Sequence, residues 1–316
     1  MKRHSPTLEG FQTMFRLPSL GLAEIAWRWS FGLAVGTLLA FSLREYLATL
    51  PVTAGEMFLL RTRQPALILQ ALSRILEGSA PRAVAALVVL LLGLTVAWTL
   101  LASLGRAAIL KSIFEYFQGR SGESETSRPG SLLYLNFLRA IVTLAAVVAS
   151  LGALFLSAAA SSNPDPSPGS ALLIFYMLML FIGLAWVVLN WFLSLAAIFI
   201  VGREQHTFGA MRAAADLCWT HPLSVTAAAI WFGLAHAFAF VVASSAAAVP
   251  LAFAEVLPAG VVLGGLLLVT LLYFAVVDFL YIGRLAAYVF MLEVPAIQLV
   301  PADDDILSDI PGLVEG

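Results

Sequence analysis

Five arginines each stand near one end of a long apolar segment: Arg28, Arg106, Arg139, Arg203 and Arg284. A guanidinium group is planar, permanently charged and offers a fork of N–H donors that matches two phosphate oxygens at once. Such groups gathered at one level of a helix bundle would suit an anionic lipid headgroup or another phosphate-bearing ligand. Arginines near helix ends also reach the headgroup layer at little cost without binding any specific ligand. The sequence leaves both interpretations open.

Two more ionisable residues, His236 and Asp278, fall within or at the edge of expected membrane spans. An ionisable group at membrane depth is a functional candidate. The alternative for His236 is a neutral imidazole that bonds to a neighbouring helix. The alternative for Asp278 is an ion pair, for which Arg284 or Arg203 is the expected partner. Both residues stay on the list of candidate site residues.

Recognisable catalytic and metal-binding motifs are absent from the sequence. No two of the four histidines have the spacing of a His-Glu-x-x-His zinc helix, and Cys218 is the single cysteine. The sequence also lacks a phosphate-cradling glycine loop with a Gly-Lys-Ser or Gly-Lys-Thr end and the nucleophile segments of intramembrane proteases. We therefore expect no metal and no cofactor, and a non-catalytic protein is favoured over an unfamiliar enzyme.

Composition places the chain in a membrane. Of its 316 residues 61% are hydrophobic and 11% charged, against about 45–50% apolar and about 25% charged in soluble domains. Only six formal charges occur between residues 140 and 277. Uncharged stretches in this region exceed the roughly 20 apolar residues that cross a bilayer. The predicted fold class is an all-α, polytopic transmembrane helix bundle.

We expect about six spans, within a single transmembrane domain that covers residues 1–294 and precedes an acidic cytoplasmic tail over 295–316. The tail contains five carboxylates and neither lysine nor arginine. Asn136 and Asn190 are expected to form interhelical hydrogen bonds. The spans are predicted near residues 28–43, 83–104, 140–160, 171–191, 222–242 and 260–277.

The distribution of basic residues predicts the orientation. With the N-terminus inside, twelve of the seventeen lysines and arginines fall on the cytoplasmic side, and the other five lie between Arg44 and Arg82. Both termini are therefore predicted to be cytoplasmic. Arginine outnumbers lysine fifteen to two, which suggests a GC-rich bacterial genome. The expected location is the bacterial cytoplasmic (inner) membrane.

Amphipathic helices are expected at both membrane surfaces. On the outer side, over about residues 53–78, Thr53 and Glu56 match a capping box, and Pro65 opens a second short helix that Gly78 can close. On the inner side, residues 106–118 are predicted to form a surface helix with Ile109 and Ile113 on its apolar face. The bundle is thus expected to carry interfacial helices at each end.

Gly-Arg pairs recur at the inner ends of the second, fourth and sixth spans, at residues 105–106, 202–203 and 283–284. This recurrence predicts three hairpins in which each inward-running helix bends or breaks at the pair. Glycines four residues apart at Gly32 and Gly36, and at Gly260 and Gly264, predict close helix contacts within the bundle. Glu24 and Arg28, four apart on one helix, are expected to form an ion pair.

The segment 202–222 contains Phe208, Ala210, Ala213 and the pair His221-Pro222. With the number of spans, it resembles uncharacterised bacterial six-span membrane families, including the membrane region attached to some glycerophosphodiester phosphodiesterases. The resemblance implies the fold class only, because no catalytic domain accompanies these residues. Mitochondrial carriers also have three hairpins, but their Pro-x-acidic-x-x-basic signature does not occur here.

Two functions fit these features. The first is a non-catalytic scaffold or accessory subunit that binds anionic lipid or a partner complex at the cytoplasmic interface. The alternative is a small-solute or lipid transporter, which would need polar groups along a path through the bundle. Expected partners are membrane lipids, with anionic lipids favoured, and a protein partner or a second copy of the chain. A net charge of −2 argues against nucleic acid.

Overall fold

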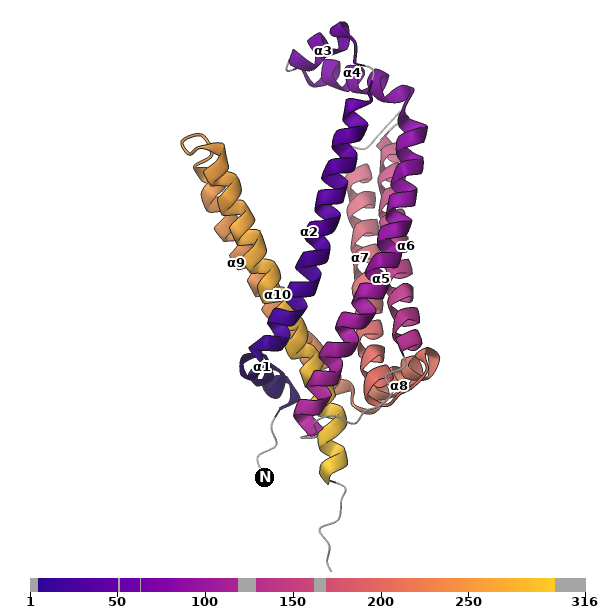
Figure 1. Ribbon diagram of the computed structural model, residues 1–316, viewed down its shortest axis with the longest axis vertical. Helices are drawn as coiled ribbons and strands as arrows, with labels where there is room; N and C mark the ends of the chain where they lie inside the picture. The colour runs from indigo at the N-terminus through magenta and orange to yellow at the C-terminus, as the bar shows by residue number, and fades with distance from the viewer. Residues whose placement is uncertain (1–4, 51, 63, 119–128, 162–168, 299–316) are drawn as a thin grey trace, which may run out of the picture.

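A computed structural model describes residues 5–50, 52–62, 64–118, 129–161 and 169–298 (Figure 1). Within these residues the regular structure is entirely helical, and six helices are long and apolar enough to cross a membrane. The predicted all-α bundle of about six spans is therefore confirmed. The six long helices are α2 (Pro18–Ala48), α5 (Ala80–Gln118), α6 (Pro129–Ser161), α7 (Ser170–Gly202), α9 (Pro222–Ala252) and α10 (Ala259–Gln298).

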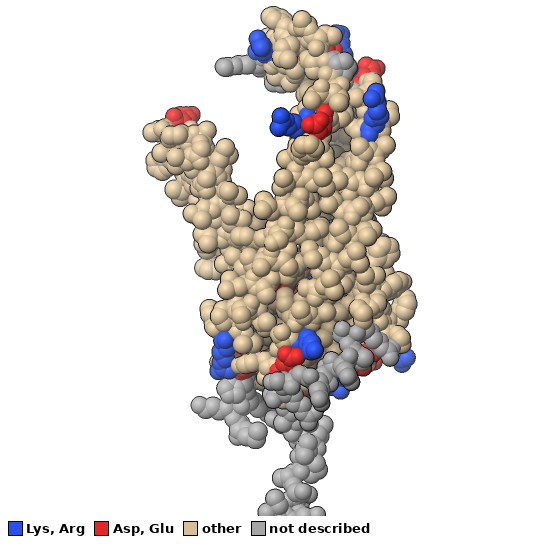
Figure 2. Space-filling view, viewed as in Figure 1, with Lys and Arg blue, Asp and Glu red and all other residues tan. Residues whose placement is uncertain are grey.

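Four shorter helices mark the two ends of the described molecule (Figure 1). Helices α1 (Pro6–Arg16) and α8 (Thr207–Thr220) lie at what we call the base end, and α3 (Ala54–Arg61) and α4 (Pro65–Glu77) lie at the cap end. Figure 2 shows charged side chains gathered at these ends and a broad uncharged belt between them. This distribution is the one expected of a bundle whose middle faces hydrocarbon.

The long helices extend beyond the predicted spans, at both ends in every case except α9, which begins at Pro222 as predicted. Helix α5 has 39 residues, which makes it about 58 Å long at 1.5 Å per residue. A bilayer's hydrocarbon core is only about 30 Å thick. The additional turns toward the base end therefore leave room for a packed region beyond the apolar layer.

The α9–α10 hairpin meets the other helices only near the base end. There α10 contacts α1, α2, α5 and α7, whereas α6 and α7 pair along their lengths. Toward the cap end the hairpin diverges from α2 and leaves a wide opening between them (Figures 1 and 2). The bundle is thus closed at one end and open at the other.

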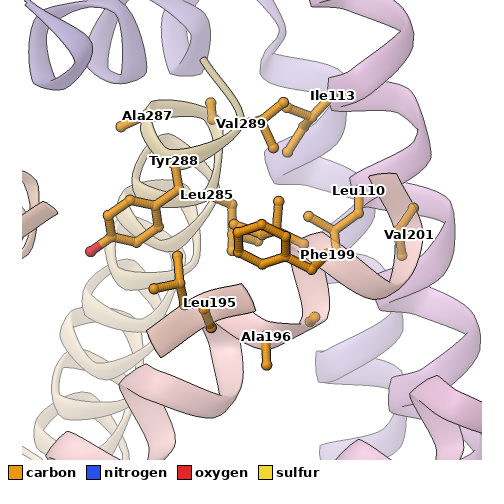
Figure 3. Close-up of a cluster of buried hydrophobic side chains, with 14 of the residues drawn as sticks. Leu110, Ile113, Leu195, Ala196, Phe199, Val201, Leu285, Ala287, Tyr288 and Val289 are labelled. Carbon is orange, nitrogen blue, oxygen red and sulfur yellow. The ribbon is translucent and has the colours of Figure 1, made fainter. Parts of the chain in front are cut away.

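The apolar core occupies the base end, and we call it the base core (Figure 3). The last turns of α7, Leu193–Val201, are buried on every side, and Tyr288, Leu285 and Leu110 are almost fully buried against them. Nearer the cap end the same helices expose their apolar side chains, for example Leu184 at 59% and Phe181 at 67%. Those exposed surfaces are suited to lipid contact, since they are uncharged.

The Gly-Arg pairs do not bend every helix as predicted. Helices α5 and α10 continue through Gly105 and Gly283, and only α7 ends at its pair, at Gly202. Each glycine instead faces an aromatic ring of another helix. A Cβ at Gly105 would lie 2.8 Å from the Trp27 ring and one at Gly283 would lie 2.9 Å from the Phe232 ring, while Gly202 lies directly against Phe114.

The predicted inner surface helix at 106–118 is a second correction. These residues are the last turns of α5, and Ile109 and Ile113 are buried in the base core rather than exposed at a surface. The apolar face was predicted correctly. It packs against other helices in the base core, however, and does not face the membrane. The predicted glycine contacts are also wrong, because a Cβ added at Gly32, Gly36, Gly260 or Gly264 would meet nothing within 4 Å.

The cap-end helices agree with the prediction. The Thr53 side chain accepts a hydrogen bond from the Glu56 N–H, and the Glu56 carboxylate accepts one from the Thr53 N–H at 2.8 Å. The second of these bonds lowers the pKa of the Glu56 carboxyl. Helix α4 spans Pro65–Glu77, as predicted. The acidic tail lies outside the described residues from 299 onward, and α10 extends to Gln298.

Helix α1 is fixed to the base end by a close backbone approach. A Cβ at Gly10 would lie 2.5 Å from the Gly283 carbonyl oxygen and 2.8 Å from Ala287 Cβ. The neighbouring Phe11 ring stacks on Phe232 with centroids 4.4 Å apart. Neither a backbone oxygen nor a short alanine can move aside as a long side chain can, so α1 tolerates no side chain at this position.

Replacing Gly10 by alanine is therefore expected to lower the free energy of unfolding by about 1–3 kcal/mol, the usual cost of overpacking. Thermal unfolding of the purified protein in mild detergent measures the effect. Gly32→Ala is the matched control, since its new Cβ would meet nothing within 4 Å. Equal melting temperatures for Gly10→Ala and the wild type would contradict the close approach of α1 and α10.

Candidate anion-binding site

Four of the five predicted arginines lie inside the bundle at the cap-side edge of the base core, where Arg284 stands between the core residues Ile282 and Leu285. Arg106 precedes the buried Ile109 on α5, which runs toward the base end, and Arg139 follows the buried Leu135 on α6, which runs away from it. Helices α2 and α10 contribute the other two. We call this set the arginine layer: Arg28, Arg106, Arg139 and Arg284.

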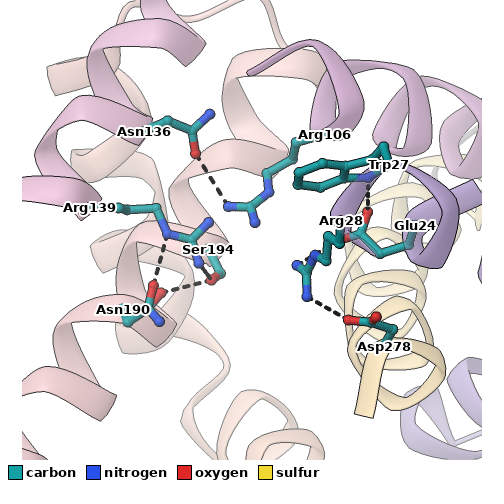
Figure 4. Close-up of polar contacts among 9 residues, drawn as sticks. All are labelled: Glu24, Trp27, Arg28, Arg106, Asn136, Arg139, Asn190, Ser194 and Asp278. Carbon is teal, nitrogen blue, oxygen red and sulfur yellow. Dashed lines mark hydrogen bonds and ion pairs between the residues drawn. The ribbon is translucent and has the colours of Figure 1, made fainter. Parts of the chain in front are cut away.

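An ion network joins α2 to α10 at this level (Figure 4). Arg28 Nη2 lies 2.5 Å from Glu24 Oε1, and Arg28 Nη1 donates to Asp278 Oδ1 at 2.6 Å. Glu24 is 1% exposed and also accepts a hydrogen bond from the Trp27 indole at 2.8 Å. The predicted pair of Glu24 and Arg28 is confirmed, although it is buried in protein.

The predicted partner of Asp278 is wrong, because Asp278 pairs with Arg28 instead of Arg284 or Arg203. Residues six apart on one helix do not share a face, so Asp278 and Arg284 point in different directions from α10. Arg203 lies beyond the end of α7 and is exposed. The aspartate thus closes the contact between α2 and α10.

Polar side chains of α5 and α6 hold Arg106. It is 5% exposed, and its Nη1 donates to Asn136 Oδ1 at 3.4 Å. Asn136 in turn donates from Nδ2 to Ser103 Oγ at 3.0 Å. These partners are all neutral, and therefore they orient the guanidinium group without cancelling its charge.

Arg139 is held in the same way between α6 and α7. Its Nε donates to Asn190 Oδ1 and its Nη2 donates to Ser194 Oγ, both at 2.8 Å. Figure 4 shows this group and Arg106 pointing toward the space between the helices. The predicted interhelical hydrogen bonds of Asn136 and Asn190 are confirmed.

One aromatic ring lies close to three of the guanidinium groups. The Tyr281 ring centroid is 4.9 Å from Arg28 Cζ, 5.4 Å from Arg106 Cζ and 5.7 Å from Arg284 Cζ. Contact with the ring face attracts each cation, but it also brings three like charges together. The Tyr281 hydroxyl is buried and has no hydrogen-bond partner among the described residues.

Each guanidinium group of the arginine layer has a nitrogen atom without a hydrogen-bond partner among the described residues. Among the described residues, the buried Nε atoms of Arg28, Arg106 and Arg284 and the buried Nη1 of Arg139 have no partner. Buried donors of this kind usually have a partner, and leaving one unpaired costs about 1–3 kcal/mol or more when it is charged. The described residues therefore satisfy these guanidinium groups only in part, and Arg28 alone among the four has carboxylate partners.

Two cavities open above the arginine layer, on its cap side. The first, about 490 Å³, lies among α2, α5, α6 and α7, and the second, about 380 Å³, lies among α2, α7, α9 and α10. They share Arg28, Trp186 and Asn190. In the first, arginine and asparagine form the end toward the base core, while side chains such as Phe31 and Trp98 line the rest.

Apolar grooves continue both cavities toward the cap end. A groove of about 480 Å³ between α6 and α7 shares Thr143 and Trp186 with the first cavity. Another of about 390 Å³ between α9 and α10 shares Leu280 with the second. The site is therefore charged at the arginine layer and apolar from there toward the cap end. A lipid, which has a charged headgroup and apolar chains, has the same order of polarity.

Charge is unevenly distributed across the site. Glu24 and Asp278 both pair with Arg28, whereas the other three arginines of the layer form no ion pair with a described carboxylate. Two like charges 10 Å apart repel by about 1.7 kcal/mol at an effective dielectric constant of about 20. A bound anion would remove this repulsion.

The two remaining candidates lie at the edges of the site. His236 lines the second cavity and shares a 3.1 Å hydrogen bond with the Tyr273 hydroxyl on α10, as its alternative reading predicts. Arg203 lines neither cavity and is exposed at the base end. Among the described residues, no three histidine, cysteine or acidic side chains come together in a group that could hold a metal ion.

Sequence reasoning missed several residues of the site: Tyr281, Ser103, Ser194 and Trp186. Serine, tyrosine and tryptophan are common in apolar helices, and nothing in their spacing distinguishes these four. Glu24 carried a usable signal, since a carboxylate four residues before an arginine in an apolar helix needs that partner. Its burial and its position beside Asp278 depend on the contact of α2 with α10.

Comparison with known proteins adds no relative, because no family model, curated protein or solved structure matches the chain. The resemblance to six-span bacterial families therefore stays a prediction. The site has to be interpreted from its own geometry.

Proposed function

We propose that this multi-pass membrane protein binds an anionic, phosphate-bearing lipid inside its helix bundle. The observation that carries the proposal is the cluster of three guanidinium groups around Tyr281, of which Arg106 and Arg284 have no carboxylate partner among the described residues. Arg28 lines both cavities, Arg106 lines the first and Arg284 lines the second. Like charges held together beside these cavities favour an anion there. Arginine is suited to phosphate because its forked donors bind two oxygens at once.

The surroundings of the cluster favour a lipid over a small ion. The headgroup would occupy the arginine layer, and the acyl chains would extend along Phe31, Trp98 and the apolar groove between α6 and α7. The layer lies 16 residues from Arg44 along α2, which is about 24 Å. That distance from the charged cap end suits the opposite headgroup level of a bilayer about 30 Å thick.

We infer a non-catalytic role as a scaffold or accessory subunit. In this role the bound lipid stabilises the arrangement of the helices. The network of Glu24, Arg28 and Asp278 joins α2 to α10, so a ligand beside it would strengthen the contact between the hairpin and the rest of the bundle. A partner complex or a second copy of the chain would then meet a fixed surface at the base end.

Native mass spectrometry of the protein extracted in mild detergent tests the proposal. The wild type is expected to retain anionic phospholipid, and the double substitution Arg106→Gln, Arg284→Gln is expected to reduce the lipid-bound fraction at least about tenfold, the equivalent of about 1.4 kcal/mol. Arg203→Gln is the matched control, because that arginine lies outside both cavities.

Lipid retention that is equal in the wild type, the double variant and the control would refute the proposed site. A loss in Arg203→Gln equal to that in the double variant would place the lipid at the base-end surface instead. Gel filtration of each variant before the measurement excludes unfolding as the cause of lipid loss.

We further propose that the protein lies in a bacterial cytoplasmic membrane with both termini in the cytoplasm. The basic residues support this orientation, since only five of the seventeen lysines and arginines of the sequence fall between Arg44 and Arg82, the part of the chain that contains α3 and α4. In a Cys218→Ala background, a membrane-impermeant maleimide added to intact cells is expected to label Ser73→Cys on α4 and to spare Ala215→Cys on α8. Both positions are exposed. The reverse labelling would invert the proposed topology.

A lipid transporter is the second candidate, favoured by the opening between α2 and the α9–α10 hairpin (Figure 2). Ionisable side chains that face the interior of a bundle often mark a transport path. Proteoliposomes containing a fluorescent anionic lipid separate the two functions. Lipid movement that is lost in His236→Ala would favour transport, whereas tight binding without movement supports the scaffold.

A further inference from the structure

We propose that the arginine layer selects a lipid whose headgroup is a terminal phosphate, a phosphomonoester dianion, over lipids whose phosphate is a diester. This inference rests on the proposed function and names the lipid class that the same site would take. Two independent features of the site carry it: the excess of positive charge and the closed end of the cavities.

The charge of the site exceeds what a monoanion neutralises. Four arginines form the layer, and two carboxylates, Glu24 and Asp278, both pair with Arg28. The remaining excess is two positive charges. A phosphodiester carries one negative charge, whereas a phosphomonoester carries about 1.5 to 2 near neutral pH. The monoester is therefore the better electrostatic match.

The guanidinium groups of the layer also suit a terminal phosphate. Arg106 and Arg139 hold only neutral hydrogen-bond partners, and Arg284 forms no ion pair with a described carboxylate. A terminal phosphate presents three free oxygens to such groups, whereas a diester presents two. Three of the groups lie within 5.7 Å of the Tyr281 ring centroid, so their charges are gathered beside the two cavities.

The base core leaves no space for a group beyond the phosphate. On α5 and α6 the cavity residues nearest the base end are Arg106 and Asn136, and on α7 and α10 they are Trp191 and Arg284. Side chains of the base core, which are almost fully buried, follow immediately on each helix: Leu110, Leu132, Leu195 and Leu285. A glycerol or ethanolamine substituent on the phosphate would have to displace this core.

The experiment compares two lipids with identical acyl chains, phosphatidate and phosphatidylglycerol, on the intact protein in phosphatidylcholine nanodiscs. Wild-type protein is expected to bind phosphatidate at least about tenfold more tightly. Removing one positive charge with Arg139→Gln is expected to reduce that preference to about twofold or less, while Arg203→Gln keeps it. Inorganic phosphate is the third probe and is expected not to displace the lipid, because it lacks the apolar chains.

Each outcome bears on a separate claim. Equal affinity for the two lipids overturns the selectivity and leaves the proposed lipid-binding function standing. Binding of neither lipid refutes both. Displacement of phosphatidate by inorganic phosphate at equal concentration would assign the site to a soluble anion and overturn the inference. The wild-type comparison needs no substitution, so a variant that fails to fold does not affect it.

Discussion

Replacing Asp278 by alanine is expected to lower the free energy of unfolding by about 3–5 kcal/mol, the usual cost of breaking a buried ion pair from one side. Asp278 is 5% exposed and accepts from Arg28 at 2.6 Å across the contact of α2 with α10. Its removal leaves a guanidinium group with one carboxylate, Glu24, among other arginines. Chemical unfolding in detergent micelles, followed by the near-ultraviolet signal of the tryptophans, measures the change.

Asp216→Ala is the control for this experiment, since Asp216 is exposed on α8 and forms no ion pair among the described residues. Its substitution should change stability by less than about 0.5 kcal/mol, as is usual at a surface. The triple substitution Glu24→Gln, Arg28→Met, Asp278→Ala should recover part of the loss, because it leaves neither a carboxylate nor a guanidinium of this network without its partner. Equal stability of Asp278→Ala and Asp216→Ala would show that the network does not hold α2 to α10.

A second large effect is expected in the base core, where Leu195→Ala should cost about 2–5 kcal/mol through lost burial and the cavity left behind. Leu195 is fully buried among the last turns of α7. The same unfolding experiment measures this change.

Leu189 on the same helix provides the matched comparison because it is 47% exposed. Leu189→Ala removes the same atoms from a surface that faces lipid or a cavity, and its cost should stay below about 1 kcal/mol. A difference between the two variants would locate stability at the base end. If both variants cost the same, the base core would not be the main source of stability.

The spans could be predicted because their signal is chemical and local. Long uncharged stretches have few alternatives to crossing a bilayer, and the capping box of Thr53 with Glu56 uses atoms three residues apart. Six crossings and the two cap-end helices follow from such patterns. The ends of the helices could not be predicted as closely, because the turns that continue into the base core contain apolar residues as well.

The base core could not be predicted, since it depends on which helices meet. Ile109 and Ile113 have the spacing of an interfacial helix, and only the arrival of α7 and α10 shows that protein covers them. The same holds for Gly105 and Gly283. In the sequence, a glycine before an arginine resembles the end of a helix. In the structure, the missing side chain makes room for an aromatic ring from another helix.

The sequence identified most of the arginines of the candidate site, but it predicted their positions in the bundle only in part. Arg28, Arg106, Arg139 and Arg284 were recognised as one set from their positions near span ends, and they do share one level of the bundle. That level lies inside the bundle, because the helices run further than the apolar stretches indicate. Arg203 was grouped with them by the same rule and lies elsewhere, since α7 ends one residue before it.

The divergence of the α9–α10 hairpin from α2 also has a consequence for the surrounding bilayer (Figure 1). The protein occupies a compact cross-section near the base end and a wider, divided outline toward the cap end, so the two monolayers meet boundaries of different perimeter. The molecule therefore presents a different perimeter to each monolayer of the membrane that holds it.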